Sequence, residues 1–334
     1  MSLSGVSATG ADLLRLVAVP VFAWAAVRDV RTRRVSSTIW IPLALLGVVL
    51  LVLDGRTAWH AGAPVWTSEF LLPAAISLGF VVPFAYLCWW VGGFGAADGK
   101  ALLVLALLFP TAPQYGVGSW AVPVATSPLG AFSFTILTNA VLVALAIPFA
   151  LAARNAAAGR FTRLMFVGRP VDWDRVPTTH GKLLSAPDED AGGGLDLDAL
   201  RMYLRWRGLT LAAVRERADR VRDPATLPAA PNPPTDGAVG ARPRTDGDGA
   251  LEGTSPMSSP DLREYDDPWG AEAFLEDIDG TAYGTTPTEL RAGLEALATR
   301  DRVWVSPGMP FLVPLALGLV IALAYGDVLL GTLL

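Results

Sequence analysis

The sequence predicts an all-α polytopic membrane protein, with six transmembrane helices and a small helical cytoplasmic domain inserted before the last span. Of the 334 residues, 52% are hydrophobic and only 17% are charged, which is too apolar for a soluble protein of this length. The charges are also concentrated, because 44 of the 57 charged residues lie between Arg154 and Arg302. We therefore expect a membrane domain at residues 1–153, a cytoplasmic domain at 154–304 and a final transmembrane helix within 305–334.

The composition excludes several kinds of site. Cys88 is the only cysteine and lies in an apolar run, which excludes a disulfide and a cysteine-based zinc site. Two histidines, His60 and His180, are too few for a histidine-led metal centre, and we expect no metal and no cofactor. The polar segment carries 19 basic and 25 acidic residues, which argues against a nucleic-acid partner. The basic residues are almost all arginine, which indicates either a halophile or a GC-rich genome.

Six apolar stretches satisfy the hydropathy criterion for transmembrane helices. They lie at approximately 11–27, 38–53, 70–91, 98–109, 129–153 and 309–326. Arginines follow the first stretch and no basic leader precedes it, so we expect it to be retained rather than removed as a secretory signal. Basic residues follow the first and fifth spans and precede the fourth and sixth, whereas the alternate side carries only Arg56 and Arg15. With six spans, every strongly basic loop is cytoplasmic and both termini lie outside.

The polar segment contains three kinds of sequence. Residues 196–223 have apolar residues at helical spacing with arginines between them, which predicts an amphipathic helix. Residues 224–260 hold eight prolines and five glycines, which predicts a disordered linker. Residues 271–280 and 286–302 predict two short helices, and a Thr-Pro-Thr-Glu start signal opens the second.

Two aspartates stand out among the six acidic residues of the membrane part. The other four lie at predicted outer ends of spans, where water is available: Asp12, Asp54, Glu69 and Asp327. Asp29 ends the first span and Asp98 begins the fourth, so the predicted topology brings both carboxylates to the cytoplasmic edge. The fourth span corresponds to about 18 Å of helix, against a hydrocarbon core of about 30 Å. Either this helix continues imperfectly toward Trp120, or Asp98 lies recessed in a cavity, where a carboxylate tends to mark function.

The stretch GGFGAADGK at 92–100 surrounds Asp98 with small residues. Gly92, Gly93 and Gly95 allow backbone angles that are closed to other residues, and they allow another chain to approach closely. A non-helical loop at membrane depth is tolerated where it lines a cavity. Two carboxylates facing one water form an acid/base pair, in which one takes a proton from the water and the other protonates a peptide carbonyl. That chemistry is peptide hydrolysis by an aspartic protease.

Other interpretations use the same residues. Asp98 suits the N-terminus of a helix dipole, Asp29 can pair with neighbouring arginines, and Lys100 can be a snorkelling lysine that sets orientation. A transporter or channel would use both aspartates as a proton or cation site, and it requires polar residues midway across the spans, for which there are few candidates: Ser77, Thr135 and Asn139. A non-enzymatic scaffold with a partner-binding cytoplasmic domain would tolerate replacement of both aspartates.

These motifs resemble those of a known family. RDVRTRRVSS at 28–37 resembles the first aspartate motif of the type IV prepilin peptidases, and GGFGAADGK resembles their second motif, Gly-x-Gly-Asp, usually followed one residue later by lysine. The archaeal preflagellin peptidases resemble the chain further, in six spans, a cytoplasmic domain before the last span, and a proline-flanked start of that span, VSPGMPFLVP. Two features depart from the pattern: Ala97 stands where many relatives carry glycine, and the cysteine-rich insert of bacterial members that methylate their product is missing.

The resemblance implies a membrane aspartic protease of the GxGD type. Asp29 and Asp98 would be its acid/base pair, and the residues that shape the substrate approach would be Gly92, Gly93, Gly95 and Lys100. The partners it implies are pilin-like or archaellin precursors, whose short basic leader is removed on the cytoplasmic side just before a hydrophobic helix, and membrane lipid. We expect no methyltransferase activity.

Overall fold

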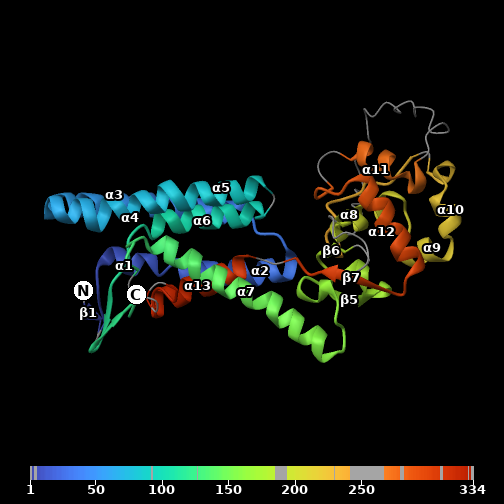
Figure 1. The fold of residues 1–334 in the computed structure, drawn as a ribbon. Coiled ribbons are helices and arrows are strands. Elements are labelled where there is room, and N and C mark those ends of the chain that lie inside the picture. Colours follow the sequence, from blue (N-terminus) through green and yellow to red (C-terminus); the bar gives the residue numbers. More distant parts are fainter. Residues whose placement is uncertain are drawn as a thin grey trace, which may run out of the picture. The chain divides into compact units, whose positions relative to one another are not determined.

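A computed structural model describes residues 2–3, 6–91, 93–125, 127–184, 194–228, 230–240, 267–278, 282–308, 311–329 and 331. The protein is mostly helical, as predicted (Figure 1). It forms two compact units, Met1–Ile147 with Met309–Leu334, and Pro148–Gly308. We call them the apolar unit and the polar unit.

Most of the apolar unit is built from helices. They are α1 (Gly10–Arg15), α2 (Ala18–Thr32), η1 (Ser37–Ile39), α3 (Trp40–Ala61), η2 (Val65–Leu71), α4 (Leu72–Ile76), η3 (Ser77–Val81), α5 (Val82–Trp90), α6 (Ala96–Leu108), the first part of α7 (Phe132–Ala157), and α13 (Leu312–Ala324). Four helical stretches are long and apolar enough to cross a membrane: Gly10–Thr32, Ser37–Ala61, Val65–Trp90 and Phe132–Ala157. They correspond to the first, second, third and fifth predicted spans.

The fourth and sixth predicted spans are the short helices α6 and α13. Each has 13 residues, or about 20 Å of helix, well below a hydrocarbon thickness of about 30 Å. The possible continuation of α6 toward Trp120 is wrong, because the chain leaves the helix after Leu108 and forms strands instead. Pro110 and Pro113 lack the backbone N–H that a continuing helix would need.

Two small sheets were not predicted by the all-α assignment. In the apolar unit, β1 (Ser2–Leu3), β2 (Val6–Ala8), β3 (Tyr115–Val117) and β4 (Trp120–Val122) pair antiparallel in that order. In the polar unit, β7 (Arg302–Ser306) pairs antiparallel with both β5 (Arg169–Asp172) and β6 (Lys182–Leu183). Strands of two to five residues carry too little alternation to be recognised against apolar surroundings.

The core of the apolar unit surrounds α6. This helix packs against α3 and α5, and α13 packs against α2 (Figure 1). Two glycines allow close helix contacts: a Cβ at Gly47 of α3 would lie 2.8 Å from the Leu107 side chain, and one at Gly318 of α13 would lie 2.7 Å from the Ala140 backbone. Small residues at such crossings let helix backbones approach in apolar surroundings.

Water does not account for two of the acidic residues expected at the outer ends of spans. Asp12 is buried and accepts a hydrogen bond from Arg15 at 2.7 Å, and the same guanidinium pairs with Asp54. Asp327 is fully buried and accepts a hydrogen bond from Thr135 at 3.3 Å. Buried charges of this kind need partners within the protein.

The polar unit has its own hydrophobic core, formed by short helices against the β5–β7–β6 sheet. Its helices are η4 (Arg163–Phe166), η5 (Trp173–Thr178), α8 (Leu197–Trp206), α9 (Leu211–Glu216), α10 (Ala218–Arg222), η6 (Pro224–Thr226), η7 (Pro268–Gly270), α11 (Ala271–Asp277) and α12 (Pro287–Thr299). The two predicted short helices are confirmed as α11 and α12, and Thr286 and Glu289 form the capping box that starts α12.

The long amphipathic helix predicted at 196–223 is divided into α8, α9 and α10. Gly208 has a φ of +66°, a left-handed conformation that ends α8 at little cost for glycine. Thr210 then caps α9, because its hydroxyl accepts the Ala213 N–H at 3.2 Å. The predicted helical spacing is confirmed, but the helix is interrupted at Gly208.

The prediction of a disordered linker is wrong for the described part of 224–260. The Asn232 N–H donates to the Trp206 carbonyl at 3.0 Å, and Arg201 Nε donates to the Gly237 carbonyl at 2.5 Å. Gly237 lies so close to α8 that a Cβ there would be 2.4 Å from the Asp198 carbonyl oxygen. The segment is held by side chains of α8 that bond its free backbone carbonyls. Residues 241–260 lie outside the described residues.

Replacing Arg201 with methionine should destabilise the polar unit. Arg201 is buried, its pKa is lowered by that burial, and it also pairs with Asp198 and donates to the Thr179 carbonyl at 2.9 Å. Removing one partner of a buried pair leaves the other unpaired, and costs about 3 kcal/mol. Limited elastase digestion of the full chain in membranes should show faster cleavage within 224–240, which contains alanine and valine but no lysine or arginine.

The matched control is Arg217→Met, because Arg217 is exposed on the surface of the same unit. It should leave the digestion rate unchanged. Equal protease resistance in Arg201→Met and the wild type would show that the proline-rich segment does not depend on this arginine.

Candidate functional site

Asp29 and Asp98 line one open cavity of about 600 Å³ in the apolar unit. The cavity is bounded by two chain segments, the end of α2 with the loop that follows it, and the first turn of α6. Its lining residues are Arg28, Asp29, Arg33, Arg34, Val35, Ser36, Gly95, Ala96, Ala97 and Asp98. The structure therefore brings together two carboxylates from distant parts of the chain, at a place that water can reach.

Asp98 is the more buried of the two carboxylates, with 9% of its surface exposed. It lies in the first turn of α6, where its Oδ2 accepts the Gly95 N–H at 3.0 Å in a capping arrangement. The backbone of Leu312, the first residue of α13, also lies near this carboxylate, close enough to act on it electrostatically. The helix-capping interpretation and the cavity-lining interpretation of Asp98 are thus both met, because a carboxylate has several acceptor positions.

Asp29 is half-buried and lies one turn before the end of α2. The helix ends at Arg33, which has a left-handed φ of 55° and donates its N–H to the Asp29 carbonyl at 2.8 Å. This position is usually glycine. The left-handed turn directs the chain back across the end of α2, so that residues 33–36 form one wall of the cavity.

Lys100 connects the two segments that carry the aspartates. Its Nζ donates to Ser37 Oγ at 2.6 Å, and Ser37 begins η1 directly after the cavity wall. Among the predicted site residues, Lys100 does not line the cavity but holds α6 to the loop that follows α2. Ser37 itself was not predicted, although it lies in the motif that contains Asp29.

The two described glycines of this loop leave room for neighbouring atoms, and they do not adopt unusual backbone angles. Neither Gly93 nor Gly95 has a positive φ, so the expectation of such angles is wrong for both. A Cβ at Gly95 would lie 3.2 Å from Asp98 Oδ2, and one at Gly93 would lie 3.3 Å from the Cys88 carbonyl oxygen. Glycine at 95 therefore lets the carboxylate fold back onto its own backbone. Gly92 lies outside the described residues.

The start of α13 supports the same region. The ring of Phe94, in the glycine-rich loop, stacks on Phe311 with centroids 4.6 Å apart and meets the edge of Phe84 at 6.4 Å. Phe311 directly precedes Leu312, whose backbone lies near Asp98. The sequence analysis noted VSPGMPFLVP only as the start of a span; its contacts with the Asp98 loop depend on long-range packing that no local pattern reveals.

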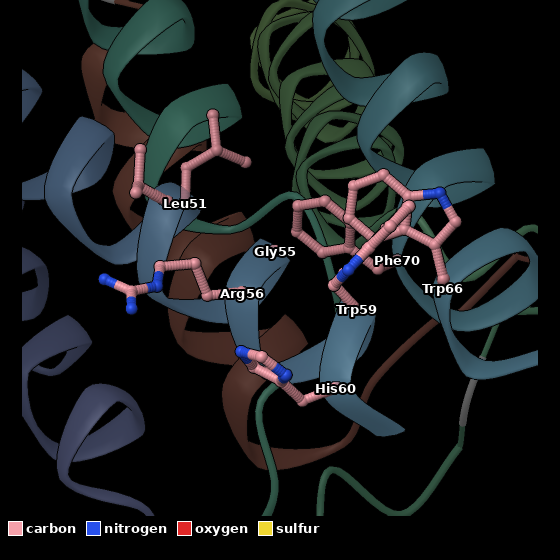
Figure 2. Close-up of a pocket in the computed structure, with 8 residues that line it drawn as sticks. Leu51, Gly55, Arg56, Trp59, His60, Trp66 and Phe70 are labelled. Carbon is pink, nitrogen blue, oxygen red and sulfur yellow. The ribbon is translucent and has the colours of Figure 1, made fainter. Parts of the chain in front are cut away.

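A second cavity, of about 500 Å³, lies at the far end of α3. Figure 2 shows the rings of Trp59, Trp66 and Phe70 gathered beside α3, with the Arg56 guanidinium directed away from them. Trp66 stacks on Phe70 at 5.3 Å and meets Trp59 edge-on at 5.2 Å. Its described lining holds no carboxylate, so it offers no acid/base pair, and the aromatic rings fit an interfacial belt.

Metal-ligand side chains do not gather in the described part of the chain. There, no group of three or more histidine, cysteine, aspartate or glutamate residues is arranged to hold an ion. The charged side chains that line the Asp29 and Asp98 cavity are these two carboxylates and three arginines.

Comparisons with known families match two parts of the chain. The model described as the type IV leader peptidase family matches residues 16–151, which include Asp29, Asp98 and Lys100. The model described as archaeal peptidase A24 C-terminus type II matches residues 263–328, which include α12, β7 and α13. Together they cover more than half of the 334 residues. No curated protein matches the chain.

Cysteines placed on the two walls of the cavity should be joined by a short bifunctional thiol reagent. In a Cys88→Ser background, which removes the only native thiol, Ser36→Cys and Ala97→Cys lie on opposite segments of one cavity. We expect a cross-linked species, detected in membranes as a changed gel mobility that reverses with a cleavable reagent.

The control pair is Ala97→Cys with Trp59→Cys, since Trp59 lines the cavity at the other end of α3, roughly 30 Å of helix away. Equal yields from the two pairs, or no product from the first, would contradict the convergence of the two segments.

Proposed function

Because this chain belongs to the type IV leader peptidase family, in its archaeal branch, we propose that it is an aspartic endopeptidase whose catalytic pair is Asp29 and Asp98. The family assigns a peptidase that removes leader peptides of the prepilin type. One observation carries the finer assignment: both carboxylates line a single cavity that is open to water.

The cavity suits general acid–base hydrolysis. One carboxylate takes a proton from a water molecule as its oxygen attacks the scissile carbonyl carbon, and the other carboxyl gives its proton to the carbonyl oxygen. The resulting diol collapses as the carbon–nitrogen bond breaks: the amine leaves with a proton returned from the first carboxyl, and the second carboxylate takes a proton from a hydroxyl of the diol. The reaction starts with one carboxylate ionised and the other carboxyl protonated. Two carboxyl groups that share a cavity favour this state, because ionising both is unfavourable.

We infer that the substrates are pilin-like or archaellin precursors, cut on the cytoplasmic side. The basic loops support this orientation, and the short helices α6 and α13 serve as the fourth and sixth spans within a bundle of six. A cavity at the end of α2 and the start of α6 would then meet a substrate at the inner membrane edge, where its hydrophobic helix begins.

A transporter using the same aspartates is not supported by the polar residues within the helices. Ser77 donates to the Ala106 carbonyl at 2.8 Å, Asn139 donates to the Gly326 carbonyl at 2.8 Å, and Thr135 bonds Asp327. Each of these side chains is bonded to a different partner within the apolar unit. They are structural contacts and do not extend the Asp29 and Asp98 cavity into a path.

Asp29→Asn and Asp98→Asn should each lower the rate of cleavage of a tagged pilin-like precursor by at least ~100-fold. An asparagine amide can neither take a proton from water nor supply an acidic proton as a carboxyl group does. Each change keeps the side-chain shape and the membrane insertion. The measurement is the rate of leader removal in membranes that contain equal amounts of each protein.

Glu69→Gln is the matched control, since Glu69 is an exposed acid of η2 and does not line the cavity. It should cleave at the wild-type rate. Persistent cleavage in both aspartate variants would exclude them as the catalytic pair, and the same loss in Glu69→Gln would point to a general effect of lost charge.

Lys100→Met and Ser37→Ala should each reduce the cleavage rate roughly tenfold, because either change releases the wall of the cavity from α6. The double variant should be no slower than the slower single variant, since the two changes remove one interaction. A double variant whose loss is the product of the two single losses would show that Lys100 and Ser37 act separately.

A further inference from the structure

The loop that follows α7 is folded back on the helix from which it emerges. It consists of residues 158–168 and includes η4, and it belongs to the polar unit. In Figure 1 the chain turns at the end of α7 and continues to β5. The reversal begins at Gly159, which has a left-handed φ of +72°.

One buried asparagine fixes this loop. Asn155, in the last turn of α7, is 2% exposed, and its Nδ2 donates to the carbonyls of Met165 and Gly168, both at 2.9 Å. Its own carbonyl accepts the Arg160 N–H at 2.9 Å. Leu164 is buried beneath the loop. The conformation is therefore specified by bonds at both ends of the loop.

The folded loop presents large apolar side chains outward. Phe161 is 75% exposed, Val167 is 48% exposed and Phe166 is 44% exposed. A loop that buries Leu164 but exposes two phenylalanines beside it does not minimise contact between apolar surface and water.

The charge of the same segment has one sign. Between the start of α7 and Val171 the sequence contains four arginines and no acidic residue. Arg154 and Arg163 are exposed and Arg160 is half-buried. Aromatic rings with arginines around them are typical of segments that lie in the headgroup region of a membrane.

We propose that residues 158–168 form an interfacial anchor, with Phe161 and Phe166 inserted among lipid chains and Arg154 and Arg163 bound to anionic headgroups. The position along the chain supports this occupant: Phe161 lies four residues after the end of α7, a helix that is long and apolar enough to cross a membrane. The loop thus emerges at the membrane surface, where the lipid is already in contact with the helix.

A basic peptide would not be attracted to this cationic surface, so the leader of a precursor is a poor candidate for it. Anionic lipid instead complements the arginines and solvates the phenylalanines together. The anchor would hold the first residues of the polar unit at the membrane surface, whichever side of the membrane that is. It is independent of the proposed catalytic pair.

The test uses a nitroxide at position 161 in the full chain, with Cys88→Ser and Phe161→Cys, reconstituted into vesicles that contain phosphatidylglycerol. Collision rates with oxygen, which partitions into lipid, and with an aqueous nickel chelate give the depth of the label. We expect oxygen collisions to dominate at position 161. The reverse should hold at Glu216→Cys, an exposed position of α9.

Replacing Arg154 and Arg163 with glutamine should raise the nickel collision rate at position 161, and so should vesicles of phosphatidylcholine alone. The matched pair Arg217→Gln with Arg220→Gln, exposed on α10 and just before it, should change nothing. A label at Phe166→Cys gives an independent reading if the first variant is poorly inserted. Labels that are as accessible to nickel as position 216, or shielded from both reagents by protein, would overturn the anchor.

Discussion

A buried carboxylate at the start of a helix too short to cross a membrane alone is the constraint on which the apolar unit depends. Asp98 lies in mostly apolar surroundings, where an unpaired charge is costly. One of its oxygens accepts the Gly95 N–H, the backbone of Leu312 lies near it, and the carboxylate borders the open cavity. Each of these partners imposes a further requirement: glycine at 95, a loop instead of helix before α6, and α13 starting beside it.

Different interactions hold the two chain segments that bound the cavity. The end of α2 is set by the left-handed Arg33 and its bond to the Asp29 carbonyl, within one short stretch of sequence. The start of α6 depends on Phe94 and Phe311, which are far apart in the chain. Matches of two family models to separate segments are consistent with this division, because the second segment contains the start of α13. The surroundings of Asp98 therefore depend on the C-terminal helix as well as on the loop before α6.

The sequence alone was sufficient for features that depend on local composition. Hydropathy located the long helices, the Thr286 capping box located α12, and Asp29 and Asp98 were singled out because they lie at the predicted inner ends of spans. Prediction from the sequence failed where contacts between residues far apart in the chain determine the structure. In the described part of the proline-rich segment, Gly237 is held by Arg201 of α8, and the pairs β2–β3 and β5–β7 join strands that are far apart in sequence. The role of Lys100 likewise depends on Ser37, which composition does not connect to it.

The arginines of the cavity bear on how the proposed reaction would be catalysed. Arg28, Arg33 and Arg34 line it together with the two acids, so a basic leader would be repelled from that wall and must lie away from it. Negative charge that develops on the carbonyl oxygen during attack would be attracted to the same wall. An interaction that strengthens as this charge develops stabilises the transition state more than the bound ground state, and so raises the rate of the chemical step. The basic run after Asp29 would then serve the reaction as well as the orientation of the chain in the membrane.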